Sequence, residues 1–162
     1  LPDKNQKFFD TMSLLDEAIQ ELRRIAHNMS PVALKRFGLK PAIQSFLEQI
    51  NISDQFDIDL QILGMDRRLP EDLEIAVYRI CQELVQNVIR HSQSAAMSIQ
   101  IIGHKDSLNI IVEDKGVGLD KENVKAGFGF NAIQSKVSLF KGSFNLESQP
   151  GKGTMALVDF PL

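Results

Sequence analysis

The sequence predicts an α/β domain in which helices pack on a mixed β-sheet. Segments with the apolar spacing of helices alternate along the chain with short segments that have the two-residue alternation of strands. The 162 residues are 43% hydrophobic and 24% charged, which is enough apolar sequence for one domain with a buried core. We find no internal repeat and no low-complexity linker. An interleaved order of helices and strands favours a layered architecture.

The composition argues against several other classes of protein. The formal net charge of −3 provides no basic field for nucleic acid. Cys81 is the single cysteine, so we expect no disulfide framework and no cysteine-rich metal site, and a reducing compartment such as the cytoplasm. No apolar stretch reaches the roughly 20 residues of a membrane-spanning helix. Because the chain begins at Leu1, we interpret it as part of a longer protein.

The first segment is predicted to be a helix from Phe8 to Met29. Its apolar residues recur at alternating spacings of four and three, which is a coiled-coil-like seam. Two interpretations stay open: a helix lying on its own domain, or one helix of a dimerisation bundle. Pro31 ends the segment, because proline disfavours helical conformation at the residue before it.

The next elements follow from periodicity and punctuation. Gly38 and Pro41 mark the start of a second helix, since proline suits a first helical turn. Strict alternation from Phe56 to Ile62 predicts a half-buried strand. A longer helix is predicted from Pro70 to His91, with acidic residues in the first turn, where the helix dipole favours them.

The C-terminal half is predicted to contain four strands and one helix. The strands cover residues 97–102, 108–112, 144–148 and 155–160, and the helix covers residues 130–140. A glycine-rich stretch from Gly116 to Gly129 separates the second of these strands from the helix. The last two strands form a hairpin.

The helix from Pro70 to His91 carries a polar row beside its apolar face. Glu83, Asn87 and His91 follow one another at intervals of four and therefore lie on one side of the helix. A carboxylate and an amide oxygen one turn apart suit Mg²⁺, which prefers oxygen ligands. Taken alone, the row fits better with the alternative that it caps neighbouring loops or faces solvent.

Three glycine-containing motifs follow this helix. Asp114–Gly118 comes directly after a strand, where a carboxylate can accept a hydrogen bond from an exocyclic amine such as that of adenine. Gly127–Gly129 precedes a helix, whose free N–H groups and dipole favour phosphate. Gly151–Thr154 joins the last two strands. Each motif also has a plainer interpretation: a turn, a flexible helix entry and a hairpin turn.

In order and spacing, these motifs resemble the N, G1, G2 and G3 boxes of the GHKL ATPases. The boxes correspond to Glu83–Asn87, Asp114–Gly118, Gly127–Gly129 and Gly151–Thr154, and the resemblance covers about residues 70 to 162. It implies the Bergerat fold, a two-layer sandwich of helices on a mixed sheet that binds ATP. The superfamily includes sensor histidine kinases, gyrase B subunits, MutL-type proteins and heat-shock chaperones.

Residues 78–91 resemble the short-lid subclass of sensor histidine kinases. That subclass usually reads RIxQExxxNxxKHA, from which Arg90 and Ser92 depart slightly. Only eight residues separate Gly118 from Gly127, which matches a short lid. The resemblance implies that residues 1–30 belong to the second helix of a dimerisation bundle. Residues 31–162 would then form the ATP-binding catalytic domain.

The resemblance also implies roles for individual residues. Asn87 would coordinate Mg²⁺ on the ATP phosphates, while Glu83 would orient the metal shell through water or act as a base. Asp114 would contact the adenine amino group. Further nucleotide contacts are implied for Arg90, His91, Lys115, Gly116, Gly118, Gly127, Phe128, Gly129 and Thr154.

The implied activity is transfer of the ATP γ-phosphoryl group to a histidine and then to an aspartate of a response regulator receiver domain. His27 is followed by Asn28 rather than by an acid, and it lies only 60 positions before Asn87. We therefore expect the acceptor histidine upstream of this chain, and this chain alone to be unable to autophosphorylate. His104 is expected to face solvent.

The full-length protein is expected to be a membrane-anchored homodimer, with this part in the cytoplasm. Two alternatives remain: a non-catalytic dimerising signalling module, and another GHKL enzyme such as a serine kinase that regulates a sigma factor.

Overall fold

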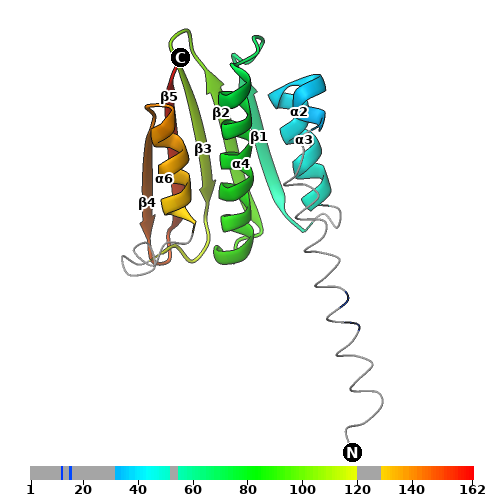
Figure 1. Cartoon of the computed structure of the whole chain (residues 1–162). Helices are drawn as coiled ribbons and strands as arrows, with labels where there is room; N and C mark the ends of the chain where they lie inside the picture. Colours follow the sequence, from blue (N-terminus) through cyan, green and yellow to red (C-terminus); the bar gives the residue numbers. More distant parts are fainter. Residues whose placement is uncertain (1–11, 13–14, 16–31, 52–54, 120–128) are drawn as a thin grey trace, which may run out of the picture.

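The described part of the chain forms a single five-stranded sheet with helices on one face (Figure 1). The computed structural model describes residues 12, 15, 32–51, 55–119 and 129–162. This architecture confirms the predicted α/β class. Met12 and Leu15 are helical and exposed, whereas the rest of the predicted helix from Phe8 to Met29, including His27, lies outside the described residues.

The sheet has the strand order β1-β2-β3-β5-β4. Its strands are β1 Asp57–Leu63, β2 Ala96–Gly103, β3 Ser107–Asp114, β4 Ser143–Gln149 and β5 Gly153–Pro161. The β1–β2 pair is parallel and the other three pairs are antiparallel. Most strands extend beyond the predicted limits, because ladder hydrogen bonds continue past the last apolar residue. The extension matters most in β3, where it brings Asp114 into the sheet.

Four helices cover one face of this sheet within the described residues: α2 Val32–Phe37, α3 Leu39–Ile50, α4 Glu71–His91 and α6 Phe130–Leu139 (Figure 1). No helix was predicted between Pro31 and Gly38, so α2 is a correction. Six residues are too few for an apolar period to be recognised. The contacts of α2 are tertiary: Leu34 is 2% exposed, and its carbonyl accepts a hydrogen bond from Arg68 Nη2.

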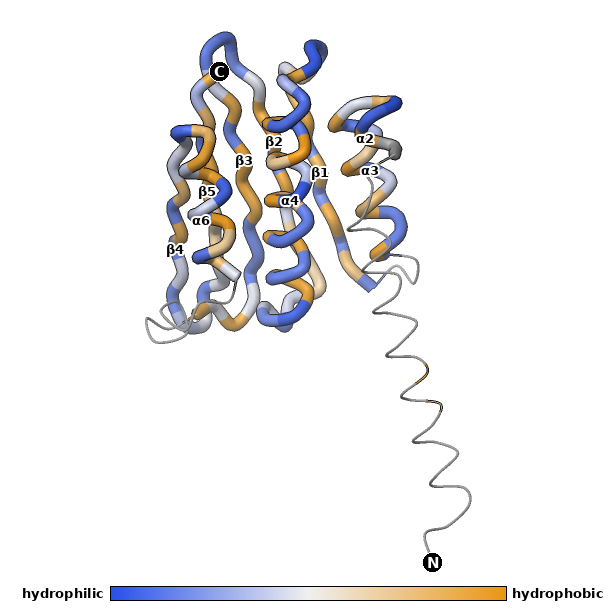
Figure 2. The backbone as a smooth tube through the Cα atoms, viewed as in Figure 1, coloured by the Kyte–Doolittle hydropathy of each residue, from blue (hydrophilic) through white to orange (hydrophobic). Residues whose placement is uncertain are grey.

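The core lies between the sheet and the helices. Figure 2 shows that β2 and β3 are rich in apolar residues, whereas polar and apolar residues alternate around α4. Side chains from both layers are completely buried, among them Val77 and Ile80 of α4 and Ile99 and Ile110 of the sheet. Each contributes about 1.5–3 kcal/mol of hydrophobic stabilisation. This packing fixes α4 across the sheet, and α4 carries the predicted polar row.

Arg68, in the loop before α4, is half-exposed and ties the start of α4 to α2, because it pairs with the buried Glu74 of α4 and donates to the Leu34 carbonyl of α2. Glu74 is 3% exposed and accepts hydrogen bonds from Arg68 Nε at 2.8 Å and Arg68 Nη2 at 2.5 Å.

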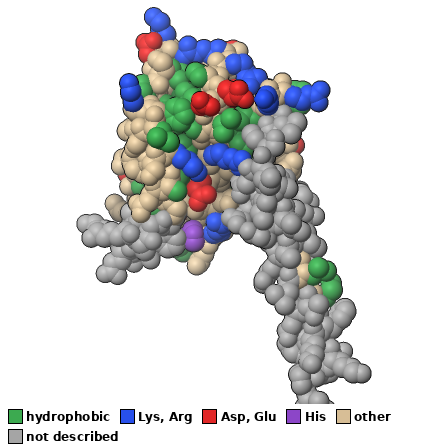
Figure 3. Space-filling model, in the orientation of Figure 1, with side chains coloured by type: hydrophobic (Ala, Val, Ile, Leu, Met, Phe, Trp, Pro, Cys, Tyr) green, Lys and Arg blue, Asp and Glu red, His purple; other side chains and the backbone are tan. Residues whose placement is uncertain are grey.

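On the helix-covered face, Lys and Arg side chains gather along the upper edge, with Asp and Glu side chains near them (Figure 3). None of the described helices has the length and apolar character needed to cross a membrane.

Candidate nucleotide-binding site

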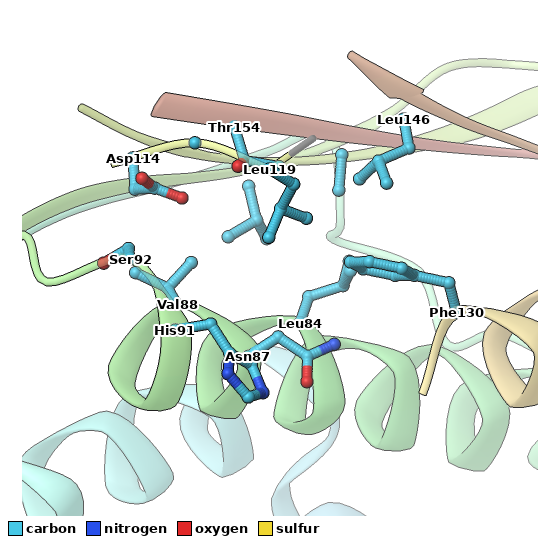
Figure 4. A pocket seen from close by; sticks show the side chains of 13 residues that line it. Leu84, Asn87, Val88, His91, Ser92, Asp114, Leu119, Phe130, Leu146 and Thr154 are labelled. Carbon is cyan, nitrogen blue, oxygen red and sulfur yellow. The ribbon is translucent and has the colours of Figure 1, made fainter. Parts of the chain in front are cut away.

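A cleft opens between the C-terminal half of α4 and the ends of β3, β4 and β5. Its empty volume, open mouth included, is about 430 Å³. Figure 4 shows its two walls, with Asn87 and His91 on the helix and Asp114 and Thr154 on the sheet. The cleft is lined by Leu84, Asn87, Val88, His91, Ser92, Val112, Asp114, Gly118, Leu119, Phe130, Leu146, Thr154 and Ala156.

The sheet wall consists of two rows of side chains that follow from strand register. Asp114 pairs with Thr154, and Thr154 pairs with Ser148, so three polar residues lie side by side on β3, β5 and β4. In the adjacent row, Val112 pairs with Ala156, and Ala156 pairs with Leu146. The wall therefore offers apolar surface for a flat ring and a polar edge at the end of the sheet.

Asp114 is a buried acceptor at that polar edge. It is 4% exposed, and the N–H of Gly116 donates to its Oδ1 at 2.8 Å. Burial raises the pKa of the Asp114 carboxyl above its usual value, although N–H groups of Gly116 and Thr154 act in the opposite direction. A partly desolvated carboxylate gains from a ligand that donates a hydrogen bond, such as an exocyclic amine.

The helix wall contains a buried amide without a hydrogen-bond partner. Asn87 is 8% exposed, and its Nδ2 has no partner in the part of the chain that the structure describes. An unsatisfied buried polar group costs free energy, and such groups are rare in native structures. Glu83 and His91, one turn to either side, are half-buried. Asn87 and His91 therefore line the cleft, and Glu83 lies beside it at Gly129.

Close backbone contact explains the first glycine of the Asp114–Gly118 motif. A Cβ atom at Gly116 would lie 1.9 Å from the carbonyl oxygen of Ser92 at the end of α4. The same carbonyl accepts a hydrogen bond of 2.8 Å from the N–H of Val117. The loop after β3 is thus held against α4, which joins the two walls of the cleft.

The start of α6 lies against the polar row of α4. Gly129, the N-cap residue of α6, has φ +78°, a left-handed conformation that favours glycine. A Cβ atom there would also lie 2.5 Å from Glu83 Oε1. The next residue, Phe130, lines the cleft. The N-terminus of α6 therefore opens beside Glu83, and its N–H groups and dipole favour an anion.

The structure brings only some of the predicted site residues to the cleft. Asn87, His91, Asp114, Gly118 and Thr154 line it, and Glu83, Gly116 and Gly129 lie directly behind or beside it. Two predicted residues point elsewhere. Arg90 is exposed and donates to Gln86 Oε1 at 3.0 Å, and Lys115 borders a separate groove with Asp57 and Glu113.

Gly127 and Phe128 lie outside the described residues, so their nucleotide contacts stay predictions. His104 is exposed, as expected. The roles assigned to the individual residues of the site remain predictions as well.

The apolar wall and Ser148 were not predicted as parts of the site. Phe130, Leu146 and Ala156 had been assigned only to secondary structure, although they line the cleft. A signal for Ser148 was present: it follows Phe144 and Leu146 at two-residue spacing on the helix-facing side of β4. A polar residue at such a position needs a partner, because an unsatisfied buried hydroxyl is costly.

Comparisons with known proteins agree with this geometry. Residues 72–162 match the family model described as histidine kinase-, DNA gyrase B- and HSP90-like ATPase. The chain is 27% identical over 154 residues to the signal transduction histidine-protein kinase/phosphatase DegS of Brevibacillus brevis, covering 94% of this chain and 40% of that protein. It is 32% identical over 148 residues to the sensor histidine kinase LiaS of Bacillus subtilis, covering 90% of this chain and 40% of that protein.

The fold is also similar to a solved structure. A histidine kinase domain from the blue-light activated histidine kinase of Erythrobacter litoralis aligns with a TM-score of 0.62 and 20% sequence identity, covering 76% of this chain and 65% of that one. At this identity the likeness concerns the fold alone. The chain spans about two fifths of the length of the curated relatives named above.

Proposed function

The chain belongs to the family of histidine kinase-, DNA gyrase B- and HSP90-like ATPases, as the ATP-binding catalytic domain of a sensor histidine kinase, and from this premise we propose how its cleft serves the kinase reaction. The complete protein transfers the γ-phosphoryl group of ATP to a histidine upstream of this chain. The observation that carries the proposal is the buried Nδ2 of Asn87, which has no partner among the described residues and lines the same cleft as the buried carboxylate of Asp114.

Adenine is bound against the sheet wall. Its ring lies on the apolar row that contains Val112, Ala156 and Leu146, and its exocyclic amino group donates to Asp114. The carboxylate already accepts the Gly116 N–H on Oδ1, which holds the group in one orientation. Thr154, the register partner of Asp114, supports this edge of the pocket. The apolar wall contributes affinity for the ring, and the polar edge determines which base is preferred.

The residues on α4 fit a magnesium ion, which Asn87 would hold when ATP is bound. Within the described ranges no group bonds Asn87 Nδ2, so the amide can turn its oxygen to a metal without breaking a described bond. Mg²⁺ is usually bound by one or two protein oxygens together with phosphates and water, so Asn87 can serve as a direct protein ligand. Glu83 orients the water shell or acts as a base.

Phosphoryl transfer depends mainly on positioning and on neutralising charge. Mg²⁺, held by Asn87 with Glu83 nearby, would supply neutralisation of part of the phosphate charge. The N-terminus of α6, entered through Gly129, favours the phosphates by its N–H groups and dipole. His91 contacts the phosphates from the cleft side of α4, and Arg90 and Lys115 contribute positive charge nearby. Gly127 and Phe128 make further contacts with the nucleotide. Gly116 and Gly118 allow the loop to approach the base and sugar.

The partners follow from the same proposal. A receiver domain of a response regulator accepts the phosphoryl group from the histidine. Residues 1–30 belong to a dimerisation bundle and residues 31–162 form the catalytic domain, so the complete protein acts as a homodimer. It is anchored in the membrane with this domain in the cytoplasm.

Phosphotransfer in trans tests the proposal. This chain is mixed with γ-labelled ATP, Mg²⁺ and the segment that precedes it in the parent protein. We expect label on that segment in an acid-labile, base-stable form, as phosphohistidine requires. Asn87→Ala should abolish transfer, whereas Gln86→Ala, one position earlier on α4, should retain it.

Acid-stable label would instead identify a serine kinase. ATP binding without transfer of label to any segment of the parent protein would indicate a non-catalytic module. Either result would contradict the proposed activity.

A further inference from the structure

Ser148 lies at the centre of a hydrogen-bond cluster directly behind the cleft. Its Oγ accepts the N–H of Leu119 at 2.7 Å, donates to the carbonyl oxygen of Gly153 at 2.9 Å and lies 2.9 Å from Thr154 Oγ1. Leu119 and Thr154 line the cleft, whereas Ser148 does not. Ser148 therefore contacts two lining residues without needing to touch a ligand.

Counting protons fixes the direction of the bond between the two hydroxyls. A serine hydroxyl has one proton and two lone pairs. Because a carbonyl oxygen can only accept, the proton of Ser148 is committed to Gly153. The Leu119 N–H takes one lone pair of Ser148, so the contact with Thr154 requires the Thr154 proton. Thr154 is the donor in that bond.

A hydroxyl that already donates its single proton in one hydrogen bond can only accept further hydrogen bonds. Thr154 Oγ1 therefore presents lone pairs to the cleft, next to the carboxylate of Asp114, its partner in the β3–β5 register. Two neighbouring acceptors at one edge of the pocket favour a ligand with an amino group there and disfavour one with a carbonyl oxygen.

We propose that Ser148 is a specificity-determining positioning residue, which keeps Thr154 an acceptor and thereby makes the cleft select 6-amino purines over 6-oxo purines. The inference rests on the proposed binding of ATP in this cleft. Without the Ser148 hydroxyl, the Thr154 hydroxyl is free to rotate and to donate its proton to a carbonyl oxygen. Discrimination then weakens although no residue facing the base has changed.

The test compares ATP with inosine triphosphate, because the two nucleotides share ribose and phosphates and differ at position 6 of the base. Dissociation constants for both are measured with Mg²⁺ on the full chain and on Ser148→Ala. In Ser148→Ala, loss of the hydrogen bond from Leu119 should weaken the binding of both nucleotides equally. The ratio of the inosine triphosphate constant to the ATP constant should fall roughly fivefold, the size of one hydrogen bond.

Two further variants separate this role from simple support of the fold. Ser148→Thr keeps a hydroxyl and should keep the wild-type ratio. Thr154→Val removes the second acceptor and should lower the ratio, and adding Ser148→Ala to it should cause no further change. If Ser148→Ala is too unstable to titrate, Thr154→Val decides, because an unchanged ratio there overturns the inference.

The outcomes for this inference and for the proposed function are distinguishable. Wild-type preference for ATP together with an unchanged ratio in Ser148→Ala would overturn the inference alone. Failure of the wild-type chain to bind ATP would overturn the proposed function, and the inference with it.

Discussion

Replacing Asn87 should stabilise the nucleotide-free protein while removing its response to ATP. The buried Nδ2 atom has no partner in the described structure, and an unsatisfied donor of this kind costs about 1–3 kcal/mol. Asn87→Ala also gains about 0.6 kcal/mol of helix propensity within α4. Against these gains, the loss of packing around one small side chain at the edge of a cleft costs about 1 kcal/mol.

The net expectation is a gain of about 1–2 kcal/mol in the free energy of unfolding. For a domain of this size that corresponds to a rise of about 2–8 °C in Tm. Thermal and urea unfolding without nucleotide measure it, with Gln86→Ala as the matched control, since Gln86 bonds Arg90 on the outer side of the same helix. With saturating ATP and Mg²⁺ the wild type should become more stable than Asn87→Ala, because a ligand at 100 times its Kd stabilises the wild type by about 2.7 kcal/mol.

A nucleotide-free Asn87→Ala variant that is less stable than the wild type would refute this reasoning. Asn87 would then be a structural residue of α4, with its partner among the residues that the structure does not describe. The unpartnered amide would no longer argue for a ligand.

Three further predictions follow. Because burial raises the pKa of Asp114, the unliganded wild type should lose stability as the pH rises from the ordinary aspartate range through that raised pKa. Asp114→Asn should remove this loss and weaken ATP binding at least about tenfold. Unfolding curves across pH measure the first effect, and calorimetry measures the second. Gly116→Ala should lower the unfolding free energy by about 2–4 kcal/mol, since its Cβ would meet the Ser92 carbonyl at 1.9 Å; an unaffected urea midpoint would contradict the close contact. Burial raises the pKa of the Cys81 thiol to about 12, so a disulfide reagent at pH 8 should label it only on unfolding, and rapid labelling of the native chain would show that α4 is more open than described.

Local patterns predicted the elements that have long, regular apolar periods. The 21-residue helix α4 combines such a period with acidic residues in its first turn, and the structure places it within one residue of the predicted limits. The short helix α2 was missed because its stability comes from contacts with residues distant in sequence, such as Arg68, which periodicity does not encode.

The site was predictable where one motif places residues on one element, and less so where several elements meet. Glu83, Asn87 and His91 share a helix, so their common side followed from spacing alone. The row of Asp114, Thr154 and Ser148 depends on strand order and register, since β3 and β5 are neighbours although β4 lies between them in sequence. The direction of the Arg90 side chain was likewise not predictable from its charge, since it donates to Gln86 along the outer surface of α4.

The most direct test of the central claim is a calorimetric titration of the chain with ATP, with and without Mg²⁺, alongside Asn87→Ala and Asp114→Asn. We predict that Mg²⁺ strengthens binding to the wild type, that Asn87→Ala loses this dependence on Mg²⁺, and that Asp114→Asn loses binding under both conditions. Equal heats and affinities for the wild type and Asn87→Ala in the presence of Mg²⁺ would contradict the assignment of the metal and nucleotide to this cleft.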